Sequence, residues 1–280
     1  MAHHASGGRT PASATGSAGN GKWEPVPILM YHAVESQPRD RKYKHFYVTA
    51  PEFRFQMHFL RRAGYHPIDL DTLESAMDGN AELPSRPVVL TFDDGYENLA
   101  TNVDPILREF GWPYTVFLVS DRIGGRNEWV VDEGYEATPL LSWEQIEEMA
   151  AGESARFEAH GCTHCNLALT NETKVREEIT GCRSALADKL GRPMRHFCYP
   201  YGGYNDTVLK VISELNMGLC VTTDFGRVRL GDDRRRLPRV SVYHVPPLSL
   251  TYGIGPINFW WRIASRNDTR PVTTSVASDS

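Results

Sequence analysis

The chain has 280 residues, a formal net charge of −5 and a pI of about 6.1. Hydrophobic residues make up 41% of it and charged residues 23%, which is the composition of a globular protein, and the acidic balance gives no indication of a nucleic-acid partner. Barrels of alternating strands and helices often use about 250 residues as one unit, so the length predicts a single domain with tails.

The two ends of the chain differ from its middle in composition. Residues 1–22 are rich in Gly, Ala and Ser and lack the apolar core of a signal peptide, so we expect a disordered tail on a cytoplasmic protein. Residues 264–280 are polar and predict a second disordered tail. The predicted domain therefore covers residues 23–263.

An apolar segment, residues 248–263, precedes the second tail. Gly253, Gly255 and Pro256 interrupt it, so no transmembrane segment is predicted. Packing across the bottom of the domain is the favoured interpretation, and a peripheral contact with a membrane or a partner is the alternative.

From residue 26 onward, short apolar runs alternate with amphipathic stretches. A Ser, Thr or Asp followed three residues later by Glu or Gln marks helix starts at Thr49, Asp71 and Ser142. Repeated strand–helix units imply parallel strands joined by right-handed crossovers, so seven or eight of them predict an α/β fold that closes, or nearly closes, into a barrel. The apolar runs predict strands at residues 26–31, 67–70, 88–92, 114–119, 156–159, 196–199, 219–222 and 240–243, and further helices are predicted at 98–110, 174–190 and 207–216.

Two adjacent carboxylates, Asp93 and Asp94, follow the buried run at residues 88–92 and precede Gly95. At such a bend both side chains can reach one cavity, where one binds a metal and the other takes a proton. About 65 residues later, His160 and His164 follow another short strand. Two imidazoles and one carboxylate form a three-ligand set that leaves a position open for catalysis, so the sequence predicts a metal hydrolase.

The five cysteines are an odd number without regular spacing, which indicates reduced thiols and not a disulfide framework. Cys162 and Cys165 have the spacing of half a structural zinc site, but no second ligand pair follows downstream. We therefore interpret both as small packing residues.

These motifs, together with Tyr199-Pro200-Tyr201-Gly202, resemble the polysaccharide deacetylases of carbohydrate esterase family 4, which share homology with the nodulation-factor deacetylase. The resemblance covers roughly residues 26–245. It implies a single-domain, distorted (β/α) barrel of about seven parallel strands. It also implies that the enzyme removes N-acetyl groups from N-acetylhexosamine units of a glycan or glycolipid.

The resemblance assigns roles to individual residues. Asp94, His160 and His164 are the metal ligands, in agreement with the three-ligand set above, and Asp93 is the general base. Tyr201 stands where the backbone N–H binds the oxyanion. Zn²⁺ is the expected metal, and Co²⁺, Ni²⁺ or Fe²⁺ suit the same ligands.

Two positions depart from the family pattern. A Ser or Thr usually follows the first histidine and helps to hold the loop, whereas this chain has Gly161, with Thr163 as a possible substitute. Many members pair the base with an Arg two residues before Pro-Tyr-Gly, where this chain has Cys198. Arg239, in a Leu-Pro-Arg segment, resembles the arginine that fills this role in the biofilm poly-N-acetylglucosamine deacetylases.

The general acid has two candidates. Family members place it in a late Leu-x-His, which Val242-Tyr243-His244 matches imperfectly. In the biofilm branch an early Tyr-His segment takes its place, and Tyr31-His32 matches that segment. The first and last strands of a closed barrel are neighbours, so either histidine can reach the same space, and we favour His32.

Two other functions remain open at this point. The same motifs occur in enzymes that act on O-acetyl sugars or on non-glycan amides, so a different amidohydrolase or esterase is one alternative. An inactive member that only binds glycan is the second, and Gly161 and Cys198 favour it slightly.

The aromatic residues near the motifs are either packing residues or platforms for sugar rings: Tyr96, Trp129, Tyr135, Tyr199 and Tyr204.

Overall fold

The computed structural model describes residues 23–43 and 45–244 of the chain. The predictions for the two tails and for residues 248–263 lie outside the described residues. Within the described ranges, no helix has the length and apolar character that a bilayer span requires.

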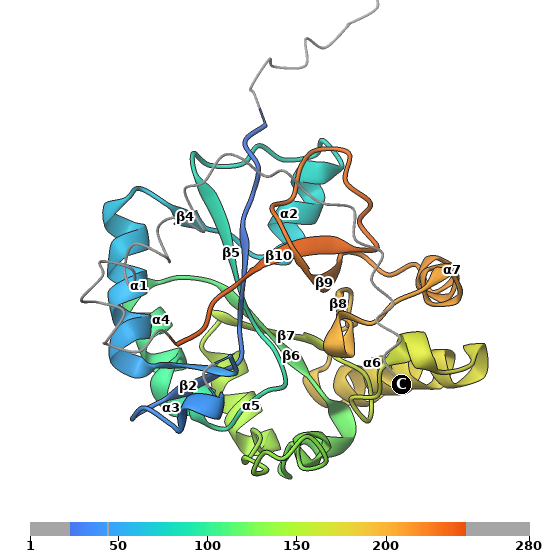
Figure 1. Ribbon diagram of the computed structural model, residues 1–280. Helices are drawn as coiled ribbons and strands as arrows, with labels where there is room; N and C mark the ends of the chain where they lie inside the picture. Colours follow the sequence, from blue (N-terminus) through green and yellow to red (C-terminus); the bar gives the residue numbers. More distant parts are fainter. Residues whose placement is uncertain (1–22, 44, 245–280) are drawn as a thin grey trace, which may run out of the picture.

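Seven parallel strands form a closed ring at the centre of the molecule (Figure 1). β1 pairs with β5 on one side and with β10 on the other, and these two pairings close the sheet into a barrel. The predicted distorted barrel of about seven parallel strands is confirmed. In spatial order the ring contains β1 (Ile28–Tyr31), β10 (Leu237–Ser241), β9 (Cys220–Phe225), β8 (Phe197–Cys198), β7 (Ala155–Ala159), β6 (Tyr114–Leu118) and β5 (Pro87–Phe92).

Three short strands lie outside the ring. β4 (His66–Pro67) pairs with the first two residues of β5, and β2 (Ala33–Glu35) pairs with β3 (Tyr47–Thr49) in a separate ribbon. The prediction of a strand at residues 67–70 is wrong for all but Pro67, because the strand ends there, Asp69 caps α2 and Leu70 begins that helix.

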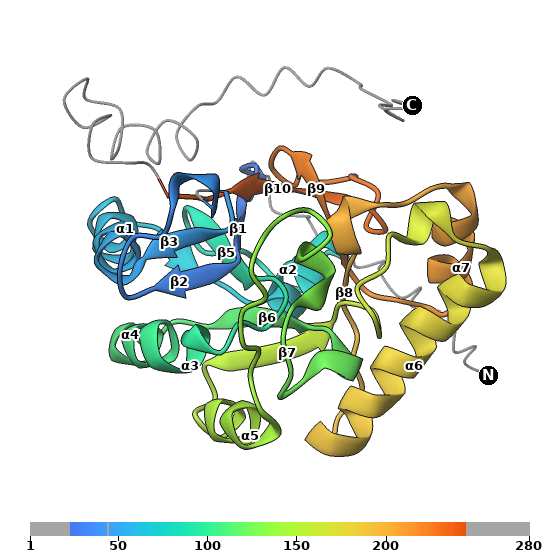
Figure 2. The same ribbon diagram turned by 60° about the horizontal axis from the view of Figure 1, so that its bottom comes forward.

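Helices surround the barrel, and the long α6 runs along its outside next to α7 (Figure 2). The strand β5 is buried along its whole length, as expected for a parallel strand whose two faces are both covered. The principal helices are α1 (Ala50–Arg62), α2 (Leu70–Met77), α3 (Asn98–Asn102), α4 (Asp104–Phe110), α5 (Trp143–Ala151), α6 (Glu172–Leu190) and α7 (Asp206–Glu214).

Capping boxes define the starts of α1 and α5. The Thr49 side chain accepts a hydrogen bond from the Glu52 N–H, and the Glu52 carboxylate accepts one from the Thr49 N–H. Ser142 and Gln145 make the same reciprocal pair at α5. Both predicted starts are confirmed.

Three details of the predicted helices are wrong. The cap of α2 is Asp69, which accepts from the Thr72 N–H, and not Asp71. The predicted helix at 98–110 is two helices that meet at Val103, because Pro105 has no N–H to continue the first one and suits the start of the second. α7 ends at Glu214, before the predicted end at residue 216.

Candidate metal centre

The C-terminal ends of β5 and β7 bring Asp94, His160 and His164 together. The Asp94 Oδ1 atom lies 3.3 Å from His160 Nε2 and 3.2 Å from His164 Nε2. All three side chains are buried, and their ligand atoms lie within 4.8 Å of one another. One carboxylate and two imidazoles at this separation are suited to a divalent cation such as zinc.

Hydrogen bonding and burial prepare these groups for a cation. The other ring nitrogen of His160, Nδ1, lies 2.8 Å from the Cys198 carbonyl oxygen, and this contact directs Nε2 toward Asp94. Burial lowers the pKa of both histidines. At His164 this effect prevails and favours the neutral imidazole that a metal requires, whereas at His160 the interactions with Cys198 and Asp94 outweigh burial and raise the pKa. Asp94 Oδ1 is a buried oxygen without a hydrogen-bond donor of acceptable geometry among the described residues. The residues present therefore fit a metal ion.

Asp93 lies beside this group and forms a buried ion pair with Arg239 of β10. Arg239 donates from its two terminal nitrogens to the two Asp93 oxygens, at 2.8 and 2.6 Å. Burial raises the pKa of Asp93, but the charge and hydrogen bonds of Arg239 outweigh burial and lower the pKa below its ordinary value. The carboxylate is thus held in its ionised form.

Cys198 occupies the space next to this ion pair. Its sulfur lies 3.2 Å from Arg239 Nη2 and 3.5 Å from Asp93 Oδ2. Cysteine is small enough to leave room for the guanidinium that reaches Asp93 from β10. The cation beside Asp93 therefore comes from β10 and not from β8, where the family pattern usually places it.

Three non-glycine residues at the site have left-handed backbones. The φ angles are 72° at Asp94, 66° at His164 and 59° at Tyr201. This conformation costs an L-residue roughly 1–2 kcal/mol, and such costs concentrate at functional sites, where they fix the direction of side chains and N–H groups. The Tyr201 ring is about half exposed and lies 4.7 Å from the His164 ring, so the predicted oxyanion residue borders the cluster.

The two candidate acids have different surroundings. His32 follows β1 and is partly exposed, with its ring 6.4 Å from Phe46. Burial raises the pKa values of Asp93 and Asp94, but Arg239 at Asp93 and the hydrogen bonds of His160 and His164 at Asp94 lower them below their ordinary values, and His32 makes a smaller contribution in the same direction. His32 therefore lies within electrostatic range of both carboxylates.

His244 is held by other partners. Its Nδ1 lies 2.9 Å from Glu52 Oε2, and its ring stacks on Tyr47 at 4.9 Å. Glu52 is the acidic residue of the capping box at the start of α1. His244 is thus tied to the start of that helix and to β3.

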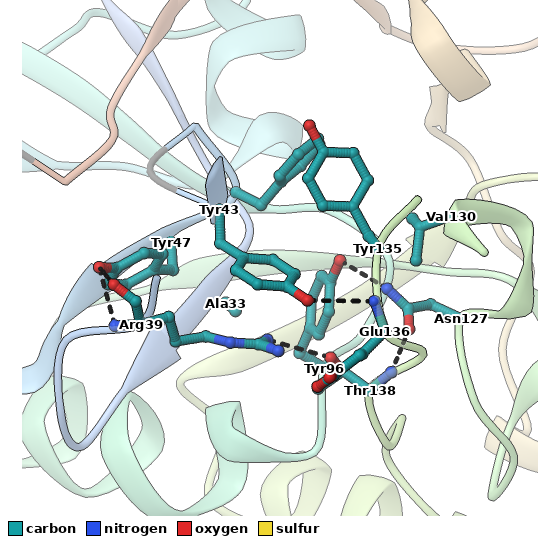
Figure 3. A pocket seen from close by; sticks show the side chains of 11 residues that line it. Ala33, Arg39, Tyr43, Tyr47, Tyr96, Asn127, Val130, Tyr135, Glu136 and Thr138 are labelled. Carbon is teal, nitrogen blue, oxygen red and sulfur yellow. Dashed lines mark hydrogen bonds between the residues drawn. The ribbon is translucent and has the colours of Figure 1, made fainter. Parts of the chain in front are cut away.

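A pocket of about 320 Å³, solvent-open space included, lies between the segment of β2 and β3 and the loop that joins β6 to α5 (Figure 3). Hydrogen bonds connect its walls: the Tyr43 hydroxyl accepts from the Glu136 N–H at 3.2 Å, and the Tyr96 hydroxyl accepts from Asn127 at 3.0 Å. These bonds hold the loop between β6 and α5, which carries Trp129.

Sequence reasoning missed two supports of the candidate metal centre. Trp129, predicted only as packing or a sugar platform, stacks on the His164 ring at 4.2 Å. Glu178 of α6 binds the loop between the two histidines. The signal that identifies Glu178 is an acid within the apolar stripe of its helix, between Val175 and Ile179.

A closed barrel with carboxylates and imidazoles gathered at the C-terminal ends of its strands has the arrangement of a barrel enzyme. The sequence model of the family described as polysaccharide deacetylase matches residues 80–219, half of the chain. The chain belongs to this family. The predicted resemblance, and with it the classification as a hydrolase, is confirmed.

Individual relatives support the biofilm branch of the family. The chain is 27% identical over 214 residues to a poly-β-1,6-N-acetyl-D-glucosamine N-deacetylase of Staphylococcus epidermidis, covering 72% of this chain and 70% of the relative. It is 25% identical over 254 residues to the Escherichia coli protein of the same name, covering 79% of this chain and 37% of that protein. The solved structure of IcaB from Ammonifex degensii matches with a TM-score of 0.70 and 25% identity, over 86% of this chain and 98% of that chain.

Proposed function

We propose that this polysaccharide deacetylase is a metal-dependent enzyme that removes the acetyl group from the 2-acetamido nitrogen of N-acetylhexosamine units in a glycan. The observation that carries the proposal is the buried group of Asp94, His160 and His164 next to the ionised Asp93. The relatives named poly-β-1,6-N-acetyl-D-glucosamine N-deacetylase support a β-1,6-linked polymer as the substrate class.

The metal would be held by Asp94, His160 and His164. Zn²⁺ is the proposed ion, and Co²⁺, Ni²⁺ or Fe²⁺ suit the same ligand set. When bound, such an ion supplies a Lewis acid that polarises the substrate carbonyl and acidifies water.

The remaining steps belong to the side chains around it. Asp93, kept ionised by Arg239, accepts the proton of the attacking water. The Tyr201 N–H donates to the oxygen that becomes negative in the tetrahedral intermediate, and one such donor typically contributes about 3 kcal/mol. His32 gives a proton to the departing amine.

Acetate release from three classes of substrate tests this proposal: poly-β-1,6-N-acetylglucosamine fragments, chitooligosaccharides and acetyl-xylan. We expect release from the first class to exceed release from the others. Release from acetyl-xylan alone would show that the enzyme is an esterase and would contradict the proposed N-deacetylase activity. If the metal-loaded protein binds the fragments but releases acetate from no substrate, it is an inactive member of the family that binds glycan.

A further inference from the structure

The loop between His160 and His164 is bound by a buried carboxylate of a distant helix. Glu178 of α6 has no solvent exposure. Its Oε2 atom accepts hydrogen bonds from the backbone N–H groups of Cys162, at 2.8 Å, and of Thr163, at 2.9 Å. Two consecutive amides of the metal-binding loop are therefore fixed by one oxygen.

The other Glu178 oxygen is also occupied. Oε1 accepts from the Thr163 hydroxyl at 2.7 Å and pairs with Lys174 Nζ at 2.9 Å. Burial raises the pKa of Glu178, but the hydrogen bonds from Thr163 and Lys174 outweigh burial and lower the pKa below its ordinary value. A buried carboxylate with every acceptor position used is a rigid attachment and not a solvated surface group.

Gly161 is adapted to this attachment. Its φ is +80°, and a Cβ built on it would lie 3.2 Å from Glu178 Oε2 and 3.6 Å from Pro200. The space beside residue 161 is thus filled by the carboxylate. His164 Nδ1 has no hydrogen-bond partner among the residues the structure describes, so no side-chain hydroxyl holds that ring.

We propose that Glu178 is the positioning residue of the metal-binding loop and that it presents His160 and His164 to the cation in place of a hydroxyl side chain after His160. The proposal rests on the proposed function only in taking these two histidines as metal ligands. Loss of a group that orients metal ligands typically lowers metal affinity about 10- to 100-fold.

The barrel offers a matched control for removal of this carboxylate. Glu158 of β7 is equally buried, and its Oε2 accepts from the backbone N–H groups of Arg195, at 2.8 Å, and His196, at 2.9 Å. Its Oε1 pairs with Arg192 at 3.0 Å. Glu158 thus makes similar bonds to those of Glu178, to a segment that carries none of the proposed ligands Asp94, His160 and His164.

The test compares Glu178→Gln with Glu158→Gln. Zinc affinity is measured by competition with a chromophoric chelator, ligand geometry by the visible spectrum of the Co²⁺-loaded proteins, and stability by thermal unfolding of the metal-free proteins. We expect both variants to lose stability, and only Glu178→Gln to lose about 10- to 100-fold in zinc affinity and to change the Co²⁺ spectrum. Thr163→Val removes a single bond to Glu178 and should lower zinc affinity several-fold if Glu178→Gln does not fold.

Two results would overturn the proposal: wild-type zinc affinity and Co²⁺ spectrum in the Glu178 variant, or equal losses of affinity in the two glutamate variants. Wild-type affinity in Thr163→Val, should Glu178→Gln fail to fold, would overturn it as well. A wild-type protein that binds zinc but releases no acetate would instead contradict the proposed function alone, because the Glu178 test is read from metal binding and not from activity.

Discussion

Arg239 of β10 and Asp93, which directly follows β5, form a bidentate ion pair with hydrogen bonds of 2.8 and 2.6 Å and almost no solvent contact for either side chain. Two parallel bonds fix the plane of the carboxylate as well as its charge. The orientation of the proposed base is therefore set by a residue 146 positions away along the chain.

Arg239→Met should destabilise the protein strongly, because it leaves the Asp93 carboxylate buried without its cation. Removal of one partner from a buried pair typically costs about 3–5 kcal/mol in the free energy of unfolding. Urea denaturation measures this cost. Arg54→Met, which breaks the exposed pair with Glu109, is the control and should leave the unfolding midpoint close to that of the wild type. A midpoint for Arg239→Met as high as that of this control would argue against the buried pair.

Asp94→Ala, His160→Ala and His164→Ala should each lose bound metal and activity together. Two remaining protein ligands are too few to hold the ion in an open site. Metal analysis after dialysis, beside acetate release, checks the prediction. Full occupancy in the His164 variant would remove that residue from the ligand set.

Asp93→Asn should keep its metal while kcat falls by about 10²-fold or more, because the substitution is nearly isosteric and deletes the proton acceptor. It also leaves the buried Arg239 guanidinium without its counter-charge, so a loss of stability should accompany the loss of kcat. The measurement is kcat beside metal content, with Asp94→Asn as the matched variant. If metal leaves with Asp93 and stays without Asp94, the roles of the two carboxylates are exchanged.

His32→Ala should lower kcat with metal content intact, and more for an N-acetyl substrate than for an activated ester, because an ester needs less protonation of its leaving group. His244→Ala should have a mild effect, since its ring is bound to Glu52 and Tyr47. A wild-type rate for the His32 variant on an N-acetyl substrate, beside a collapsed rate for the His244 variant, would reverse the assignment.

The barrel strands and the four residues of the Asp-Asp and His-x-x-x-His motifs could be predicted from the sequence, because each motif directly follows a predicted strand. β2 and β3 could not, since strands of three residues show no periodicity. The cap of α2 was misplaced by two residues because Asp69 and Asp71 are chemically equivalent candidates, and only Asp69 has the extended backbone of a cap.

The supports of the site were harder to predict than its ligands. Arg239 was found through the family resemblance, and no local pattern connects it with Asp93. Glu178 and Trp129 act on the loop and ring of the second motif from α6 and from the loop after β6. Their effect depends on tertiary contacts between segments that are separate in the sequence, which spacing alone does not reveal.

The central claim is that a metal held by Asp94, His160 and His164 is required for N-deacetylation. The most direct measurement is acetate release from poly-β-1,6-N-acetylglucosamine fragments. It compares the purified protein, the same protein after chelation and dialysis, and the chelated protein after Zn²⁺ is added back. We predict release that disappears on chelation and returns with Zn²⁺ in the wild type, and no return in Asp94→Ala. Undiminished release from protein shown by elemental analysis to hold no metal would contradict the account.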